Sequence, residues 1–305
     1  MRDQISGKIL TCSGGLYRVE TSEGIVECYA KGSFRHDGVV PVPGDQAVLR
    51  TEGIGDKKTA YLTDLLNRKN CLLRPPVANL DRMFLVCSVT NPEPSLLNFD
   101  KICSVCCHNE IEVVLIFSKS DLDEEKGERL KRIYQGIGFP VFLLNMQEKE
   151  KARELLLPLI QGVSSAFTGA SGVGKSTLMN LLFPELKLNT GDISRKISRG
   201  KNTTRQSEFY NVSCYTGVDE SYLADTPGFS QLDFRRFHFM EKEELADSFP
   251  EFREYIGTCR YTKCTHQKEE GCSILSALEQ GALSPSRHES YCKLYQDLAA
   301  YKKWK

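Results

Sequence analysis

The segment from 169 to 177 contains the residues whose types and spacing specify chemistry most clearly. It matches the pattern G-x-x-x-x-G-K-S of phosphate-binding loops. Its residues are Gly169, Ala170, Ser171, Gly172, Val173, Gly174, Lys175, Ser176 and Thr177. The glycines allow the backbone to wrap around a phosphate, so that successive N–H groups point inward beside a helix N-terminus. Lys175 would contact the β- and γ-phosphates, and the Ser176 hydroxyl would bind Mg²⁺.

A second motif follows the apolar run Val113–Phe117, which is expected to be a buried strand. Its residues are Ser118, Lys119, Ser120 and Asp121. They resemble the guanine-specificity motif N-K-x-D, with serine in the first position. The Asp121 carboxylate would pair with the N1–H and the exocyclic amine of guanine, whereas adenine presents the opposite donor–acceptor pattern. The alternative is that Asp121 only caps a helix beginning near Leu122.

A third motif reads D-x-x-G from Asp225 to Gly228, after a short apolar strand. Asp225 would hold Mg²⁺ through water, and the Gly228 N–H would meet the γ-phosphate. Between this motif and the phosphate loop, the polar and basic segment Gly191–Ser207 contains Thr203 and Thr204. One of these threonines is expected to close over Mg²⁺ in the triphosphate state.

The order of these motifs indicates a rearranged chain. An ordinary GTPase runs from the phosphate loop through the switch threonine and D-x-x-G to N-K-x-D. Here the motif at 118–121 precedes the phosphate loop at 169. Because the termini of domains often lie close together, joining the old ends and opening the chain elsewhere can preserve the same sheet. The order predicts a circularly permuted GTPase.

A candidate metal site lies near the C-terminal end of the sequence. Its expected ligands are Cys259, Cys264, His266 and Cys272. Three thiolates and one imidazole suit one tetrahedral, structural Zn²⁺ per chain. The alternative is a set of unrelated buried cysteines. A second group, Cys103, Cys106, Cys107 and His108, lies within an apolar helical pattern, which favours core packing over metal binding.

Composition and local patterns predict the domain organisation. A length of 305 residues suggests two or three domains. Alternating segments between glycine turns predict an OB-fold-like β-barrel over 1–70, and Pro75-Pro76 suggests a linker over 71–80. Alternating apolar strands and amphipathic helices predict the α/β GTPase domain over 81–240. Helical segments at Lys242–Ile256, Ser276–Gly281 and Tyr291–Trp304 predict a helical zinc-binding domain over 241–305.

The charge balance argues against a globally charged surface, because Lys+Arg and Asp+Glu each number 40. A local basic face for RNA on the barrel and an ordinary solvated surface both remain open. The basic residues concerned are Lys31, Arg35, Lys57, Lys58, Arg68, Lys69 and Arg74. The apolar runs are too short to span a bilayer, and the first residues lack the apolar core of a signal peptide. Twelve cysteines without an export signal favour reduced thiols and a cytoplasmic protein. We expect a monomer.

The chain resembles ribosome small-subunit-dependent GTPase A, the RsgA-type family of circularly permuted GTPases. The resemblance includes the barrel-like start, Arg74-Pro75, Asn79 and Asp81 together with the three nucleotide motifs and Cys259–Cys272. It implies an OB-fold, a permuted GTPase domain that uses Mg²⁺ with GTP and GDP, and a helical zinc domain. It also implies binding to the small ribosomal subunit and its rRNA, with stimulated hydrolysis during late maturation. Two departures are Asn202, where the family has histidine, and Ser118, where it has Asn or Thr.

The residue after D-x-x-G favours assisted catalysis. Many GTPases have a glutamine there that orients the attacking water, whereas this chain has Phe229. Basal hydrolysis should therefore be slow, at roughly 10⁻⁴–10⁻² s⁻¹, and a partner must supply the missing group or order the switches. Two alternatives remain, namely a phosphate-loop ATPase or kinase, and a binding module for which the nucleotide is only a structural or sensory ligand.

Overall fold

The computed structural model describes residues 4–32, 34, 38–52, 59–186, 207–225 and 232–301. Thr203, Thr204 and Gly228, together with Asn202 and Phe229, lie outside these ranges. The chain forms two compact units. The first comprises Met1–Arg82, Glu150–Phe167 and Ser176–Gly228, and the second comprises Met83–Lys149, Thr168–Lys175 and Phe229–Lys305.

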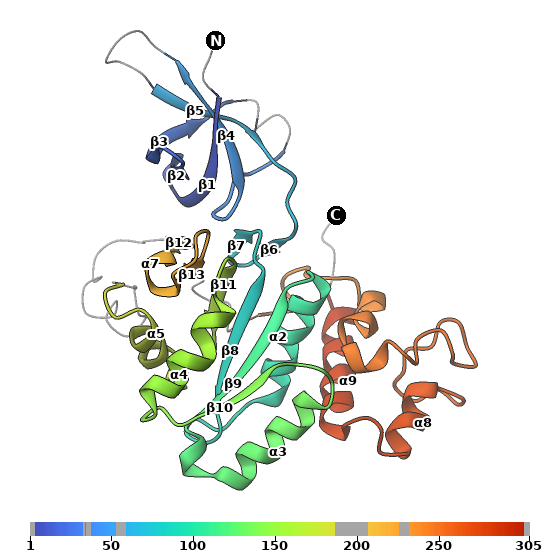
Figure 1. Ribbon diagram of the computed structural model, residues 1–305. Coiled ribbons are helices and arrows are strands. Elements are labelled where there is room, and N and C mark those ends of the chain that lie inside the picture. Colours follow the sequence, from blue (N-terminus) through green and yellow to red (C-terminus); the bar gives the residue numbers. More distant parts are fainter. Residues whose placement is uncertain are drawn as a thin grey trace, which may run out of the picture. The chain divides into compact units, whose positions relative to one another are not determined.

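The first unit begins with a five-stranded barrel, blue in Figure 1. Its strands are β1 (Gln4–Ser13), β2 (Leu16–Thr21), β3 (Gly24–Ala30), β4 (Gln46–Glu52) and β5 (Thr59–Leu65). Strand β1 pairs with both β2 and β4, which closes the sheet, and β3 pairs in parallel with β5. Ile9, Val19 and Leu62 are fully buried inside it. The prediction of a barrel of the OB type is confirmed.

Residues 71–80 do not form a simple linker. They contain a two-stranded hairpin of β6 (Cys71–Leu73) and β7 (Pro76–Ala78). The Asn70 amide donates to the Leu80 carbonyl at 2.7 Å and its side-chain oxygen accepts from the Leu80 N–H at 3.0 Å, which joins the two ends of the hairpin. A proline pair marked a turn inside this hairpin, and the sequence pattern did not distinguish that turn from a linker.

Among the described residues, the first unit also contains three strands and three helices that lie after residue 148. They are α4 (Lys149–Leu156), β11 (Ser164–Thr168), α5 (Lys175–Leu182), β12 (Glu208–Asn211), α7 (Ser213–Thr216) and β13 (Tyr222–Asp225), with a 3₁₀ turn at Leu157–Leu159. Strand β13 pairs in parallel with β11 and antiparallel with β12. Strand β11 leads into the phosphate loop, and β13 ends at Asp225, the first residue of D-x-x-G.

The N-terminal part of the second unit contains three neighbouring strands and two α-helices among the described residues. They are β8 (Arg82–Ser88), α2 (Leu96–His108), β9 (Glu112–Ser118), α3 (Glu124–Gln135) and β10 (Val141–Leu144). Strands β9 and β10 run parallel. The thiols of Cys103 and Cys106 are buried in the core-facing side of α2, and burial raises their pKa values well above the usual range. Core packing is confirmed for Cys103 and Cys106, whereas Cys107 and His108 are only partly buried.

The C-terminal part of the second unit differs in detail from the predicted helices. Lys242–Ile256 contains three short 3₁₀ helices, η3 (Lys242–Glu244), η4 (Ala246–Ser248) and η5 (Pro250–Phe252), where a continuous helix was expected. Pro250 explains part of the break, because a residue before proline avoids the helical conformation, and Phe249 is extended at φ −102° and ψ 100°. The α-helices are α8 (Ser273–Glu279) and α9 (Pro285–Ala299). Within the ranges described above, no helix is long and apolar enough to cross a membrane.

Helix α9 is joined to α2 by a buried ionic network in the second unit. The Arg287 side chain is 1% exposed and donates to Glu251 at 2.7 and 3.2 Å and to Asp100 Oδ1 at 2.5 Å. Its guanidinium also lies over the Phe249 ring, 4.4 Å from the centroid. Burial opposes the charge, but attraction to the two carboxylates more than offsets it and holds the Arg287 pKa well above its usual value.

Replacing Arg287 by Ala should destabilise the protein by about 3–5 kcal/mol, because two buried carboxylates would lose their partner. Urea unfolding measures this change. Arg235→Ala is a matched control. Arg235 also pairs with an aspartate, Asp297, at 2.7 Å, but its side chain is 63% exposed, so the expected loss is within about 1 kcal/mol. Equal effects of the two substitutions would contradict a special role for burial.

Candidate functional site

Ser118 ties the guanine-like motif to the phosphate loop. It is the last residue of β9 and is fully buried. Its hydroxyl oxygen lies 2.5 Å from the Val173 carbonyl oxygen and 3.3 Å from that of Cys87. A serine can therefore occupy the first position of this motif and still brace the loop through a hydrogen bond to its backbone.

Lys119 extends the same connection. It adopts a left-handed backbone conformation with φ 56°, which turns the chain sharply after β9. Its ammonium donates to the Gly172 carbonyl at 2.9 Å and to the Asn91 carbonyl. The Lys119 ammonium thus connects the segment after β9 to the loop after β8 and to the phosphate loop.

Asp121 is exposed and lies inside the short 3₁₀ helix Ser120–Leu122. The helix that follows begins at Glu124, and its cap is Asp123, whose carboxylate accepts from the Lys126 N–H at 3.0 Å. The alternative that Asp121 caps this helix is wrong. The cap of this helix therefore does not use the Asp121 carboxylate.

Asp121→Asn should shift nucleotide preference from guanine toward xanthine, because the amide offers a donor where xanthine has a carbonyl. We expect a change in the GDP-to-XDP affinity ratio of about 10²-fold or more, since a buried polar mismatch discriminates strongly. Competition binding measures it. Asp123→Asn, two residues away at the helix cap, should leave the ratio unchanged. An unchanged ratio in Asp121→Asn would remove this residue from the site.

The phosphate loop begins at a glycine that no other residue could replace without movement. Gly169 is buried with φ 156°, and an added Cβ would collide with the Val86 carbonyl of β8. At Gly174, an added Cβ would meet the side chains of Met146 at 3.8 Å and Ser118 at 3.9 Å. The loop therefore lies close to β8 and to the C-terminal ends of β9 and β10.

Two neighbours of the loop were not predicted. Met146 follows β10, and the segment with Asn91 and Pro92 follows β8, where an added Cβ on Gly172 would meet Pro92 Cδ at 3.8 Å. Both lie just after apolar strands, and Ser118 is the last residue of such a strand. Because parallel strands end at the same edge of a sheet, strand ends were a signal that could have identified them.

The remaining predicted nucleotide residues are placed as follows. Ala170, Ser171 and Thr177 are exposed, while Lys175 and Ser176 are half-buried at the start of α5. Asp225 ends β13, opposite Glu208 of β12. The switch segment with Thr203 and Thr204, and Gly228 of D-x-x-G, fall outside the described residues.

The four predicted metal ligands converge in the second unit. The ligand atoms of Cys259, Cys264, His266 and Cys272 all lie within 4.8 Å of one another. Cys259 Sγ is 3.9 Å from Cys272 Sγ, and His266 Nδ1 is 3.6 and 3.5 Å from these two sulfurs. One metal ion can contact all four atoms at once.

Hydrogen bonds hold the loop that carries these ligands. The Glu269 carboxylate accepts from the backbone N–H groups of Thr265, Gln267 and Lys268 at 2.9–3.1 Å. Burial raises the pKa of Glu269, but the hydrogen bond from the Thr265 hydroxyl, together with bonds from backbone N–H groups, outweighs burial and leaves the pKa at about 2. His266 itself has a left-handed backbone conformation at φ 59°, and its carbonyl accepts from His288 Nε2 at 2.7 Å. These hydrogen bonds help to position the loop that carries the four ligand side chains.

The barrel carries fewer free cations than its sequence suggested. Lys31 pairs with Glu52 at 2.8 Å, Arg68 with Asp45 at 2.7 Å and Lys69 with Asp81. Arg35, Lys57 and Lys58 lie outside the described residues. Three of the seven basic residues therefore serve ion pairs within the protein.

A row of outward residues crosses the barrel instead. Leu16, Tyr29, Tyr61 and Arg50 are successive register partners on β2, β3, β5 and β4. Their sequence neighbours Tyr17, Cys28 and Leu62 are buried, so the row faces outward, and Tyr29 is 51% exposed. Two adjacent tyrosines flanked by an arginine provide surfaces on which bases can stack.

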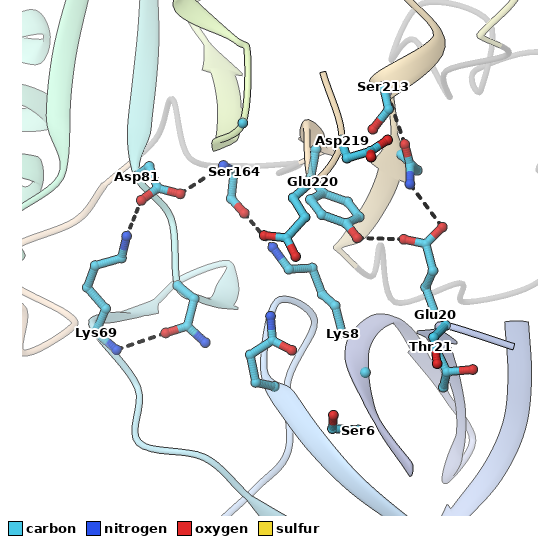
Figure 2. Close-up of a pocket in the computed structure, with 17 residues that line it drawn as sticks. Ser6, Lys8, Glu20, Thr21, Lys69, Asp81, Ser164, Ser213, Asp219 and Glu220 are labelled. Atoms are coloured by element: carbon cyan, nitrogen blue, oxygen red, sulfur yellow. Dashed lines mark hydrogen bonds and ion pairs between the residues drawn. The ribbon is translucent and has the colours of Figure 1, made fainter. Parts of the chain in front are cut away.

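A polar cavity of about 850 Å³ lies between β1 and the ends of β11 and β13 within the first unit (Figure 2). The Lys8 ammonium donates to Ser164 Oγ at 2.6 Å and lies 4.0 Å from the centre of the Tyr222 ring. Burial lowers the pKa of Lys8 from 10.5 to about 8, although Asp81 and Glu220 oppose this shift. The cavity is lined by both acidic and basic side chains and by no glycine-rich loop, which distinguishes the cavity from a phosphate-binding site.

Comparisons with known proteins cover nearly the whole chain. A family model described as RsgA GTPase matches residues 65–235, and one described as RsgA N-terminal domain matches residues 6–61. The small ribosomal subunit biogenesis GTPase RsgA of Clostridium perfringens (strain SM101 / Type A) is 35% identical over 295 residues, covering 96% of this chain and 98% of the relative. The protein of the same name from Clostridium botulinum (strain Langeland) is 35% identical over 305 residues, covering 98% and 100%.

Solved structures agree with these relatives. The chain is similar to YloQ, described as a circularly permuted GTPase, with a TM-score of 0.77 and 28% identity over 99% of this chain and 98% of that one. It is also similar to YjeQ from Thermotoga maritima, with a TM-score of 0.81 and 29% identity over 98% and 100%.

Proposed function

The chain belongs to the RsgA family of circularly permuted GTPases and is a GTP hydrolase, and we propose that it acts on the small ribosomal subunit during its late maturation. In this proposal the subunit and its rRNA bind the protein and stimulate hydrolysis of GTP to GDP. The relatives are named for biogenesis of that subunit. The protein acts as a monomer in the cytoplasm, where the subunit is assembled.

One observation carries the nucleotide part of the proposal. Ser118 and Lys119 both contact the backbone of the phosphate loop, at 2.5 and 2.9 Å, while Asp121 is left unused by the helix that follows. This arrangement supports a site in which the base meets Ser118–Asp121 and the phosphates meet Gly169–Thr177. Ser176 and Asp225 would hold Mg²⁺, directly or through water, and Thr203, Thr204 and Gly228 would respond to the γ-phosphate.

The metal proposed for the C-terminal cluster is Zn²⁺. Tetrahedral zinc, with Zn–S near 2.3 Å and Zn–N near 2.0–2.1 Å, separates two sulfurs by about 3.8 Å and a sulfur from a nitrogen by about 3.6 Å. The separations of 3.9, 3.6 and 3.5 Å fit these values. Four protein ligands leave no open position, so the ion would be structural.

The outward row of the barrel supports contact with single-stranded rRNA. Stacking on Tyr29 and Tyr61 is tolerant of sequence and is worth about 1–3 kcal/mol per base. Arg50 at the end of the row would meet phosphate. The basic switch segment, which includes Arg199 and Lys201, would add contacts in the triphosphate state.

Binding to purified small subunits tests this proposal. We expect Tyr29→Ala to weaken binding by roughly 5- to 150-fold, since one stacked base is lost. Tyr29→Phe keeps the ring and should bind like the wild type. The wild type should bind more tightly with a non-hydrolysable GTP analogue than with GDP, and affinity should fall steeply with salt. Equal affinity for the subunit with the GTP analogue and with GDP would contradict a nucleotide-dependent switch. It would indicate that the protein binds the subunit in either nucleotide state.

A further inference from the structure

The buried Arg287 network reaches beyond the pairing of two helices. Asp100 of α2 accepts hydrogen bonds from both Arg287 at 2.5 Å and the Tyr134 hydroxyl at 2.8 Å. Tyr134 lies on α3 and is fully buried. One carboxylate oxygen therefore joins α9 to two helices that flank β9.

Tyr134 continues the connection to the nucleotide motif through aromatic packing. Its ring centroid lies 5.1 Å from that of Phe99 and 5.9 Å from that of Phe117, and these two phenylalanines stack at 5.4 Å. Phe117 directly precedes Ser118, whose hydroxyl reaches the phosphate loop. Because rings in a close-packed core move together, a displacement of Tyr134 would also move Phe117 and the adjacent Ser118.

At its other end, the network reaches the loop that holds the metal ligands. Figure 1 shows α9 (red) beside α2 (green), with the C-terminal loops around it. His288, next to Arg287, donates to the His266 carbonyl at 2.7 Å, and the Tyr291 hydroxyl donates to the Thr265 carbonyl at 2.9 Å. Three residues within about one turn of a helix thus contact the ligand loop and Asp100.

We propose that Arg287 is a positioning residue that couples occupation of the nucleotide site to the packing of the C-terminal cysteine–histidine module. The inference rests on the proposed nucleotide site at Ser118–Asp121 and Gly169–Thr177. A nucleotide that orders Ser118 and Lys119 fixes Phe117 and Tyr134, and Tyr134 then presents Asp100 to Arg287. By thermodynamic reciprocity, a well-packed module must strengthen nucleotide binding by the same factor.

Coupling through Ser118 and Tyr134 differs from coupling through the D-x-x-G segment, because only the latter depends on the γ-phosphate. GDP alone should therefore produce the effect. The alternative is that the network only stabilises the fold, in which case its loss would loosen α9 equally with and without GDP.

Amide hydrogen exchange of the full-length, metal-loaded protein separates these cases. In the wild type, GDP should slow exchange in α9 and in residues 259–272. Tyr134→Phe removes the hydroxyl that holds Asp100 but keeps the ring. We expect the GDP-dependent slowing to fall roughly 2- to 12-fold, the equivalent of one net hydrogen bond, and GDP affinity to fall by the same factor.

Two further variants complete the test. Tyr210→Phe is the matched control, because it removes a hydroxyl that donates to Glu208 at 2.8 Å on β12, and it should leave the GDP-dependent slowing unchanged. Arg287→Lys keeps the charge but loses the two-pronged contact with Glu251, and should reduce the slowing as Tyr134→Phe does. If Arg287→Lys does not fold, Tyr134→Phe decides alone.

The outcomes distinguish this inference from the proposal beneath it. GDP binding by the wild type with the same slowing in Tyr134→Phe would overturn the coupling and leave the nucleotide site intact. Failure of the wild type to bind GDP would overturn the nucleotide site and the coupling together. A reduced slowing in Tyr134→Phe with an unchanged control supports the coupling.

Discussion

Lys175→Ala should lower the rate of GTP hydrolysis by about 10²–10³-fold, with the protein still folded. The lysine ammonium would stabilise charge on the β- and γ-phosphates, and removal of one preorganised donor from a transition state costs rates of this size. Ser176→Ala should act similarly by loosening Mg²⁺. Single-turnover hydrolysis at saturating GTP measures both effects.

Stability provides the control for this prediction. Lys175 is half-buried at the start of α5 and is not part of the apolar core, so the nucleotide-free variant should unfold within about 1 kcal/mol of the wild type. Lys131→Ala removes a surface lysine whose contact with Glu128 is 3.9 Å, and it should change neither rate nor stability. A large loss of stability in Lys175→Ala would mean that the lysine serves the fold.

Cys264→Ser should remove bound zinc and unfold the segment around residues 250–290. Metal binding in small cysteine and histidine modules provides on the order of 10–16 kcal/mol of apparent folding free energy, and the loss of one of four ligands forfeits much of it. Elemental analysis should find one zinc per wild-type chain and much less in the variant. Hydrogen exchange should locate the unfolding.

Cys292→Ser is the matched control for the metal prediction. Cys292 belongs to the same module, but its sulfur lies 3.7 Å from the His288 ring and outside the four-ligand cluster. Its replacement should leave the zinc content unchanged. Cys264→Ser should still bind GDP, with an affinity lowered only by the coupling factor proposed above. The absence of metal from wild-type protein prepared without chelators would contradict the zinc assignment.

The parts of the site that the sequence predicted are those that short segments determine. The phosphate loop needs glycine at 169 and 174 and a lysine at 175, and these requirements are visible within nine residues. The metal ligands lie within fourteen positions, so the loop alone brings them together. Strand β9 was predicted at Val113–Phe117 because a continuous apolar run suits a strand buried on both faces.

Interactions between distant segments were not predictable in the same way. Nothing near Asp100 or Arg287, which are 187 positions apart, indicates that they pair. Arg287 lies in a polar stretch of the sequence, and such a stretch is usually exposed to solvent. The same holds for two basic residues predicted on the barrel. The sequence gives the charge of Arg68 and Lys69 but does not indicate the carboxylates with which they pair. Pairing depends on the tertiary fold.

Local conflicts explain the remaining differences. The hairpin at 71–78 was interpreted as a linker because proline seldom occurs within a strand. In a two-stranded sheet, however, both strands are edge strands, and an edge strand can contain proline. The break at Pro250 was foreseeable from its effect on the preceding residue, and helical periodicity in Lys242–Ile256 obscured it.

The most direct test of the central claim is GTP turnover by the purified full-length protein with and without small ribosomal subunits. With Phe229 in place of a water-orienting glutamine, we expect a basal rate of roughly 10⁻⁴–10⁻² s⁻¹ and stimulation by the subunit of at least about tenfold. ATP should not be turned over under either condition. The same GTP turnover with and without subunits would contradict a GTPase that acts on the small ribosomal subunit.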